Sequence, residues 1–309
     1  MTKVLVTGGA GFIGSHIVEA LLEEGYEVVV IDNFSSGKFD HIKDLPVKIC
    51  PFDITDPRVI DVIVDLHPSF IIHQAAQVSV AESVHDILHD ENVNVKGSLH
   101  VIQAAIRASV EKILFASSAA VYGNPMALPV TIDHPTLPES PYGLTKLTVE
   151  KYLKLAHKFY GLSYGILRYS NVFGPRQDGK GEGGVISIFA DRILENEAPI
   201  IYGSGEQTRD FIFVKDVAYA NVQALKQQEN VCLNISSNNR ISINQLWEKM
   251  GKISGFSFNP IYKAERAGDI LHSILCNEET IAQLEWMPRT NLENGLRETL
   301  FSSKKVLQK

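Results

Sequence analysis

Residues 4–14 read VLVTGGAGFIG, an apolar run followed by closely spaced glycines. The apolar run predicts a buried strand, and the periodicity of residues 13–24 predicts a helix directly after the glycines. Glycines permit a tight turn and let the backbone approach a pyrophosphate closely, while the helix N-terminus offers N–H groups and a favourable dipole. A plain strand-to-helix turn is the alternative. Strand, glycines and helix nevertheless occur in the order that a dinucleotide site requires, with Gly8, Gly11 and Gly14 at its turn.

The second predicted strand ends at Asp32, 18 residues after Gly14. A carboxylate at this place accepts hydrogen bonds from ribose hydroxyls and repels a 2′-phosphate, so the sequence favours NAD over NADP. Asp53, after the third predicted strand, is interpreted in two ways. It is a contact to the adenine, or it is an acid that starts the next helical turn, and both interpretations stay open.

Short apolar runs alternate with helical patterns through the first half of the chain. Continuously apolar strands are typical of a parallel sheet covered on both faces, and the helices between them predict right-handed crossovers. We therefore expect an α/β fold, a doubly wound parallel sheet (Rossmann fold) with a second, smaller, mixed α/β substrate domain. Residues 1–168 are expected to form the NAD-binding domain, which also takes segments near 210–236, and residues 169–309 mainly the interleaved substrate domain. The predicted strands are residues 4–6, 28–31, 47–49, 70–72 and 113–115, and the long predicted helices are residues 91–107 and 142–160.

The charge balance of the chain restricts its partners. Its 309 residues include 29 Lys and Arg against 36 Asp and Glu, a formal charge of −7, which argues against a nucleic-acid-coating or membrane-surface protein. No apolar run reaches the length of a membrane span, and the first residues lack a signal-peptide pattern. The three cysteines are too far apart for close pairing, which is typical of reduced thiols, so we expect a cytoplasmic protein.

Three histidines are weighed as functional residues and set aside. His85 and His89 have the spacing of a zinc-binding helix, but the Glu after the first His and a third ligand are missing. We therefore expect no metal site. His73, at a strand end, is interpreted as a structural histidine.

Reactive side chains gather near the start of the predicted helix 142–160. Tyr142 and Lys146 are four residues apart and share a helix face, so the ammonium favours the phenolate and lowers the pKa of the phenol. This spacing is weak evidence alone. It gains weight from Ser117 and Ser118, which follow the predicted strand 113–115, because ligands bind at the carboxyl ends of parallel strands. Capping of a turn is the alternative for one of these serines.

These motifs occur in one order along the chain, and together they resemble the extended short-chain dehydrogenase/reductase family, within it the UDP-glucose 4-epimerase group. The resemblance runs from Val4 to about Trp286, and the set is far more specific than any single motif in it. It consists of residues 7–14, Asp32-Asn33, His73-Gln74-Ala75-Ala76, Asn94, residues 117–123 (SSAAVYG), residues 142–146 (YGLTK) and residues 168–176 (RYSNVFGPR).

The resemblance implies a nicotinamide mechanism without net redox change, in which a UDP-hexose passes through a transient 4-keto form. It implies that Tyr142 removes the proton of the sugar 4-hydroxyl, that Ser118 hydrogen-bonds that oxygen, and that Lys146 binds the nicotinamide ribose and tunes Tyr142. The implied cofactor contacts are Gly8, Gly11, Phe12, Ile13, Gly14, Asp32, Asn33, Asp53, Ile54, Ala75, Ala76, Asn94, Tyr142 and Lys146. The implied substrate contacts are Ser118, Tyr142, Asn171, Arg209, Arg266, Asp269 and Ser273.

Five of these positions bear on the substrate. Arg209 and Arg266 match the family's diphosphate-binding arginines, as an acidic protein that binds a diphosphate requires, with a surface ion pair as the alternative for each. Ala119 and Ala120 stand where related dehydratases carry an Asp-Glu pair, so the acid and base for elimination are missing. Ser273 matches a position that is small where N-acetyl sugars fit. We therefore expect UDP-GlcNAc and UDP-GalNAc to be accepted besides UDP-glucose and UDP-galactose.

Two other functions stay open. A 4-epimerase of UDP-glucuronate would need an additional Arg or hydroxyl cluster that the sequence does not assign. A dinucleotide-sensing regulator on the same fold usually lacks an intact Ser, Tyr and Lys set, which this chain keeps. The resemblance also suggests a homodimer in which the two long helices pair across a two-fold axis. The apolar residues available for that contact are Leu99, Ile102, Ile106, Leu147, Tyr152 and Leu155.

Overall fold

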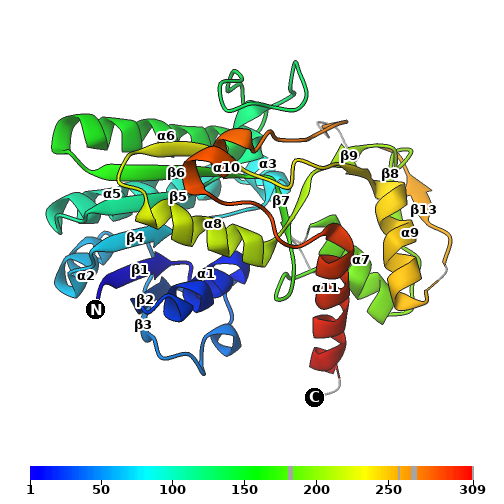
Figure 1. The fold of residues 1–309 in the computed structure, drawn as a ribbon, viewed down its shortest axis with the longest axis horizontal. Helices are drawn as coiled ribbons and strands as arrows, with labels where there is room; N and C mark the ends of the chain where they lie inside the picture. The colour runs from blue at the N-terminus through cyan, green and yellow to red at the C-terminus, as the bar shows by residue number, and fades with distance from the viewer. Residues whose placement is uncertain (180–183, 257, 266–269, 308–309) are drawn as a thin grey trace.

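The computed structural model describes residues 1–179, 184–256, 258–265 and 270–307, and it contains a seven-stranded parallel sheet (Figure 1). The strand order is β11-β6-β5-β4-β1-β2-β3, and every neighbouring pair is parallel. The first strand therefore lies inside the sheet, which grows outward from it in both directions. This confirms the predicted doubly wound sheet. The strands are β1 (Lys3–Thr7), β2 (Glu27–Asp32), β3 (Lys48–Pro51), β4 (Phe70–His73), β5 (Lys112–Ser118), β6 (Ser163–Tyr169) and β11 (Val231–Ile235).

Helices cover both faces of the sheet because successive side chains of each strand point to opposite faces. Val4 and Val6 of β1 belong to one hydrophobic core, while Leu5 between them belongs to the other. The first core is shared with α1 (Phe12–Glu23) and α8 (Val214–Lys226). The second is shared with α2 (Val59–Leu66), α5 (Ser98–Arg107) and α6 (Pro141–Tyr160).

The predicted helix 91–107 is helical throughout, but it is not one regular α-helix. The chain forms α4 (Ile87–Glu91), a π-helical segment (Asn92–Gly97) and then α5. The Ser98 hydroxyl donates to the carbonyl oxygen of Asn94, so a side chain takes the acceptor that an α-helical N–H would use. A hydroxyl placed in this way disturbs the regular helical ladder.

Ile102, which the sequence made available for a subunit contact, is 5% exposed and packs in the core with Val101. It faces the sheet and not the solvent. The periodicity identified an apolar face of this helix, but that face belongs to the core of one chain.

The remaining elements form a second group around their own hydrophobic core, which contains Phe173, Phe189 and Trp247. Figure 1 shows α7, α9 and α11 gathered on the side away from the large sheet. Pairs of short strands connect them: β7 with β10, β9 with β12 and β8 with β13. These elements are β7 (Asn171–Phe173), α7 (Val185–Leu194), β8 (Ile200–Tyr202), β9 (Thr208–Arg209), β10 (Phe211–Phe213), β12 (Ile241–Ser242), α9 (Ile243–Ser254), β13 (Ile261–Lys263) and α11 (Leu292–Leu307).

Short helices complete the chain: α3 (Val80–His85), α10 (Glu278–Leu284) and 3₁₀ turns at Phe39–His41 and Ala119–Tyr122. Within the described ranges, the helices are too short or too polar to cross a membrane.

Candidate active site

A cavity of about 1330 Å³ lies at the carboxyl ends of β1, β2, β4 and β5, where parallel sheets bind ligands. Its opposite wall comes from β7, α7 and β8, so both groups of elements contribute to it. Sixteen of the predicted contact residues line this one cavity: Gly8, Gly11, Phe12, Ile13, Gly14, Asp32, Asn33, Asp53, Ile54, Ala75, Ala76, Ser118, Tyr142, Lys146, Asn171 and Arg209.

The glycine turn after β1 has a shape that side chains would block. Gly8 has a φ of +68°, and a Cβ there would lie 2.7 Å from the amide nitrogen of Ala75. A Cβ on Gly14 would lie 2.1 Å from the carbonyl oxygen of Gly8. The turn therefore brings bare backbone and the uncharged first turn of α1 to the cavity wall, which is the cradle that a pyrophosphate requires.

Asp32 is buried at the end of β2 and is fixed by backbone. Its Oδ2 accepts from the Ala10 amide at 2.9 Å and its Oδ1 from the Phe34 amide at 2.8 Å. Burial raises the pKa of Asp32, and the two amide donors oppose that rise. The remaining lone pairs of both oxygens are available to ribose hydroxyls at the cavity wall.

Asp53 lines the cavity and also organises a turn. Its Oδ1 accepts from the amide and the hydroxyl of Thr55, both at 2.7 Å, and its Oδ2 accepts from the Asn33 amide group at 2.8 Å. Asn33 and Asp53 thus join the loops after β2 and β3. The structure gives Asp53 the turn-forming contacts of the second interpretation and also the cavity position of the first.

Ser118, Tyr142 and Lys146 converge on the cavity from two elements. Ser118 is the last residue of β5, and Tyr142 lies in the first turn of α6, which starts at Ser140 as N-cap, with Pro141 following. The Ser118 hydroxyl accepts from the Ala120 amide at 3.1 Å, so this serine caps a turn while it lines the cavity. The Lys146 ammonium lies 5.7 Å from the centre of the Tyr142 ring.

Lys146 is almost completely buried. Its Nζ donates to the carbonyl oxygen of Ala116 at 2.9 Å and lies 5.0 Å from the centre of the Phe115 ring. Burial lowers the pKa of Lys146 to about 8, and the Asp90 carboxylate partly opposes this. The ammonium is therefore poised to lose its proton just above neutral pH.

Ser117 has a different role from its neighbour. Its hydroxyl donates to Glu150 Oε1 at 2.6 Å, and Glu150 forms a bidentate ion pair with Arg168, at 2.9 Å from Nε and 2.7 Å from Nη2. Arg168 Nη1 also donates to the Tyr122 hydroxyl at 2.9 Å. This buried group joins α6 to β5 and β6 behind the cavity.

Sequence reasoning missed a buried carboxylate, Asp90. It accepts from Gln77 Nε2 and Asn94 Nδ2, both at 2.9 Å, and from the Thr145 hydroxyl at 3.0 Å. Asp90 therefore links the loop after β4, the π-helical segment and the residue before Lys146. The one local signal for Asp90 was its place four residues before Asn94, since the resemblance used Asn94 alone.

Asn94 lies outside the cavity lining and is occupied with protein. Its side chain accepts from the Gln77 amide and donates to the Gln77 carbonyl oxygen, at 2.9 and 3.0 Å. These bonds position the loop that carries cavity residues Gln77 and Val78. Its assignment as a direct cofactor contact stays a prediction.

His73 is held from both sides, with Nδ1 2.6 Å from the Thr7 hydroxyl and Nε2 2.9 Å from the Ser98 hydroxyl. Burial, with the nearby Lys146 charge, lowers the pKa of His73 to about 3, so the ring is neutral and structural. His85 and His89 lie in separate short helices, α3 and α4. Across the described ranges, no group of three or more metal-ligating side chains comes together.

On the opposite wall, Asn171 donates to the carbonyl oxygen of Asp210 at 3.3 Å, and Arg209 Nη1 donates to the carbonyl oxygen of Thr208 at 3.0 Å. The Ser273 amide donates to that same Thr208 oxygen at 3.2 Å, so Ser273 lies next to the strand of Arg209 but outside the cavity lining. The other two predicted substrate contacts, Arg266 and Asp269, lie outside the described residues.

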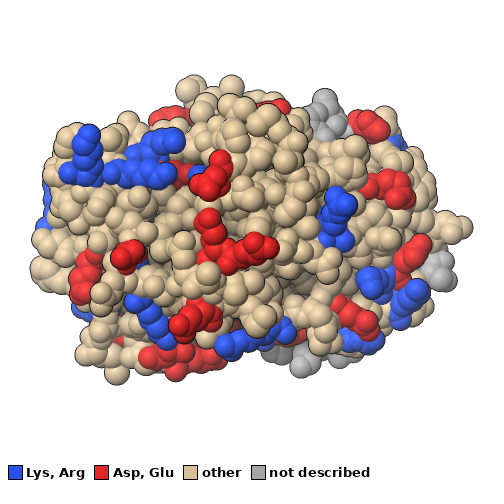
Figure 2. Space-filling view, turned by 45° about the horizontal axis from the view of Figure 1, so that its top comes forward, with Lys and Arg blue, Asp and Glu red and all other residues tan. Residues whose placement is uncertain are grey.

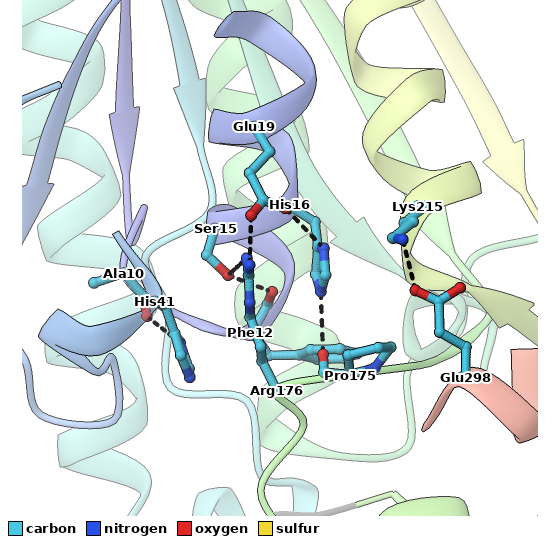
Figure 3. Close-up of polar contacts among 10 residues, drawn as sticks. All are labelled: Ala10, Phe12, Ser15, His16, Glu19, His41, Pro175, Arg176, Lys215 and Glu298. Atoms are coloured by element: carbon cyan, nitrogen blue, oxygen red, sulfur yellow. Dashed lines mark hydrogen bonds and ion pairs between the residues drawn. The ribbon is translucent and has the colours of Figure 1, made fainter. Parts of the chain in front are cut away.

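A group of polar contacts ties α1 to the segment after β7 (Figure 3). His16 Nε2 lies 3.1 Å from the carbonyl oxygen of Pro175, and Arg176 donates to the Ser15 hydroxyl at 3.1 Å and to the Glu19 carboxylate. These partners are more than 150 residues apart in the chain. Arg176 belongs to the motif of residues 168–176, which predicts no role for it.

Proteins with this strand order and a glycine turn of this shape bind dinucleotides, and the chain falls in that class. It belongs to the NAD dependent epimerase/dehydratase family, which matches residues 4–236. NAD, the cofactor that the sequence favoured, is the cofactor of this family.

Similar proteins extend over nearly the whole chain. A protein of Methanocaldococcus jannaschii described as a putative UDP-glucose 4-epimerase is 43% identical over 295 residues, 95% of this chain and 96% of that protein. The crystal structure of UDP-glucose 4-epimerase with UDP-glucose from Thermotoga maritima is 40% identical, with a TM-score of 0.96 over 99% of this chain and 100% of the other. A UDP-N-acetylglucosamine 4-epimerase from Methanobrevibacter ruminantium is 37% identical, with a TM-score of 0.94 over 99% of each chain.

Proposed function

We propose that this protein catalyses the NAD-dependent 4-epimerisation of a UDP-hexose. The observation that carries the proposal is the convergence of Ser118, Tyr142 and Lys146 on the cavity that the glycine turn enters. The similarity to UDP-sugar 4-epimerases over almost the full length supports the same activity.

The residues of the cavity fit the cofactor. The backbone of the glycine turn and the first turn of α1 would hold its pyrophosphate, and the Asp32 carboxylate would accept from the adenosine ribose. Lys146 would bind the nicotinamide ribose. When bound, NAD would supply a reversible acceptor for the hydride of the sugar C4, so that the overall reaction has no net redox change.

The protein's own residues manage the proton. Tyr142 Oη takes the proton of the sugar 4-hydroxyl, and the nearby Lys146 ammonium stabilises the phenolate that must exist before that transfer. Ser118 Oγ hydrogen-bonds the same sugar oxygen. The 4-keto sugar turns within the cavity, and Tyr142 Oη then gives the proton back on formation of the other 4-epimer.

The opposite wall selects the substrate. Arg209 and Asn171 line the cavity across from the catalytic group and, with Arg266 and Asp269, would hold the sugar nucleotide, the two arginines at its diphosphate. The small Ser273 favours acceptance of UDP-GlcNAc and UDP-GalNAc beside UDP-glucose and UDP-galactose. The similar N-acetylglucosamine enzyme supports this wider range.

A homodimer is part of the proposal. The outer side of α6 carries exposed apolar side chains, including Leu144, Tyr152, Leu155 and Phe159. Figure 2, which brings the top of the molecule forward, shows a group of Lys and Arg side chains at its upper left and broad areas without charged side chains beside it. A mass near 34.2 kDa by light scattering would contradict a dimer.

The activity is tested by incubating the purified protein, without added cofactor, with UDP-galactose, UDP-GalNAc and UDP-galacturonate in separate reactions. Chromatography should show the 4-epimer of the first two, and heat should release NAD from the protein. Epimer from the uronate alone would favour the UDP-glucuronate epimerase instead. NAD release without any epimer would point to a dinucleotide-sensing regulator.

A further inference from the structure

The segment after β7, residues 174–178, crosses from the substrate wall of the cavity to the cofactor helix α1; we call it the strap. Its contacts with α1 are visible in Figure 3. His16 Nε2 donates to the Pro175 carbonyl oxygen, because that oxygen can only accept. The Arg176 guanidinium donates to the Ser15 hydroxyl and to the Glu19 carboxylate. At the other end, Gln177 Nε2 donates at 3.1 Å to the Val172 carbonyl oxygen of β7.

Arg176 is the centre of this arrangement. Its backbone has a φ of +71°, a conformation that costs energy for a residue with a Cβ and persists only where the surroundings hold it. Its guanidinium makes two of the contacts to α1, and a charge-assisted hydrogen bond to a carboxylate is stronger than a neutral one. The Lys38–Asp178 ion pair, at 3.1 Å, also reaches the strap, but both side chains are more than half exposed, so it contributes little.

Glu19 is a suitable anchor for Arg176. Burial alone would raise the pKa of Glu19, but the contacts with His16 and Arg176 lower it to about 2. The carboxylate is therefore ionised throughout the working pH range. Both partners are about one quarter to one third exposed, so water screens this pair less than a fully exposed one.

The place of these contacts relates them to the cofactor. Ser15 follows directly on Gly14, the last glycine of the turn, and both Gly14 and Arg176 line the cavity. A pyrophosphate at the start of α1 would lie beside the strap. A separation of the two walls as the dinucleotide leaves would break the Arg176 contacts.

We propose that Arg176 is a positioning residue that ties the strap to α1 through Ser15 and Glu19 and thereby slows the release of NAD. The proposal rests on the proposed function for the identity of the ligand, but it concerns cofactor retention and not the chemical step.

The test measures the rate at which bound NAD leaves the full-length protein, followed by the fluorescence change when excess ethenoadenine-NAD replaces it. Arg176→Met should release NAD roughly tenfold faster, since an ion pair and a charge-assisted hydrogen bond are lost. Arg176→Lys keeps the charge but loses the forked donors of the guanidinium. Its NAD release rate should lie between those of the wild type and Arg176→Met. Glu19→Gln should release NAD faster as well, and its combination with Arg176→Met should add little, because the two residues act through one contact.

Arg297→Met is the matched control, because Arg297 also pairs with a glutamate on a helix, Glu293 of α11, but at the surface and away from the cavity. It should release NAD at the wild-type rate. The urea midpoint of the NAD-free protein checks that Arg176→Met is folded.

Unchanged release in both Arg176→Met and Glu19→Gln overturns the proposal, as does equally fast release in Arg297→Met or full additivity in the double variant. A wild-type protein that takes up no NAD overturns this inference and the proposed function together. If the wild type holds NAD but forms no 4-epimer, only the proposed function fails, and the release rates still decide the role of the strap.

Discussion

The Lys146 ammonium donates a 2.9 Å hydrogen bond to the carbonyl oxygen of Ala116, two residues before the end of β5. This bond joins the helix that carries Tyr142 to the strand that carries Ser118. The phenol and the hydroxyl are thus placed by two rigid elements that this bond and the Ser117–Glu150 bond hold together. Precise placement of reacting groups depends on support of this kind.

Replacement of Tyr142 by Phe should lower kcat roughly 10²–10⁴-fold, because the proton acceptor is lost while the ring still fills its place. The NAD content after purification should not change. Steady-state kinetics with UDP-galactose and absorbance of heat-released NAD check the two parts. Turnover close to that of the wild type would exclude Tyr142 as the base.

The buried Lys146 predicts how activity depends on pH. Because the pKa of Lys146 is lowered to about 8, the ammonium is present below that pH and is lost as pH rises through it. The neutral amine cannot stabilise the Tyr142 phenolate by charge. We therefore expect kcat to fall with rising pH, with a midpoint near 8, in a profile measured at saturating substrate.

Asp90→Asn should move this fall of kcat to lower pH. Asp90 favours the charged form of Lys146, so the pKa of Lys146 falls further when the carboxylate becomes an amide. Asp61→Asn, on the exposed side of α2, makes the same charge change and should leave the profile in place. If Asp90→Asn lowers kcat but leaves the pH midpoint of its alkaline fall unchanged, Asp90 acts through its hydrogen bonds alone.

Gly14→Ala should abolish the binding of NAD, since the new methyl group would lie 2.1 Å from the Gly8 carbonyl oxygen and displace the turn. Gly255 provides a contrast. It has a φ of +77° but open space around it, so Gly255→Ala should cost about 1 kcal/mol of stability from backbone strain and leave NAD binding intact. Titration calorimetry with NAD and urea unfolding separate the two effects. Equal loss of NAD binding in both variants would mean that a general loss of stability, and not the close approach of Gly14 to Gly8, prevents binding.

Glu150→Gln should destabilise the fold by about 3–5 kcal/mol, because it leaves the Arg168 guanidinium buried without its carboxylate. The urea midpoint is the measurement. Adding Arg168→Met should recover part of the loss, since it removes the unpaired charge. If Glu150→Gln alone is as stable as the wild type, the Arg168 guanidinium binds another acceptor or water in the variant.

The sequence predicted five of the seven strands of the sheet because their signals are local, but it did not predict β6 and β11. Residues 4–6 and 113–115 place apolar side chains on both faces of the sheet. The turn after residues 4–6 needs residues without a side chain, and the glycines there are visible in the sequence. The sequence could not show that the Ser117 hydroxyl donates to Glu150 while the Ser118 hydroxyl accepts from the Ala120 amide, because Glu150 lies 33 residues away from Ser117, in α6. The periodicity of the helix also could not show that its face with Ile102 packs in the core of one chain and not against a second subunit.

The missed residues share a different cause. Asp90 and Arg176 act through partners far along the chain, Gln77 and Thr145 in one case and Ser15 and Glu19 in the other. Apart from the Asp90–Asn94 spacing, these contacts leave no regular spacing to detect in one sequence. The roles of Arg266, Asp269 and Ser273, and the division of the chain into two domains, stay predictions.

The position of the last strand of the large sheet restricts how chimaeras of related proteins can be built. β11 pairs with β6, and α8 before it packs beside α1, although both follow the first elements of the substrate wall in the chain. A chimaera made with a single crossover after β6 would join a foreign helix and strand to the edge of the native sheet. Recombination that transfers sugar preference therefore has to keep residues 214–235 with the parent scaffold and graft the pieces on either side of them.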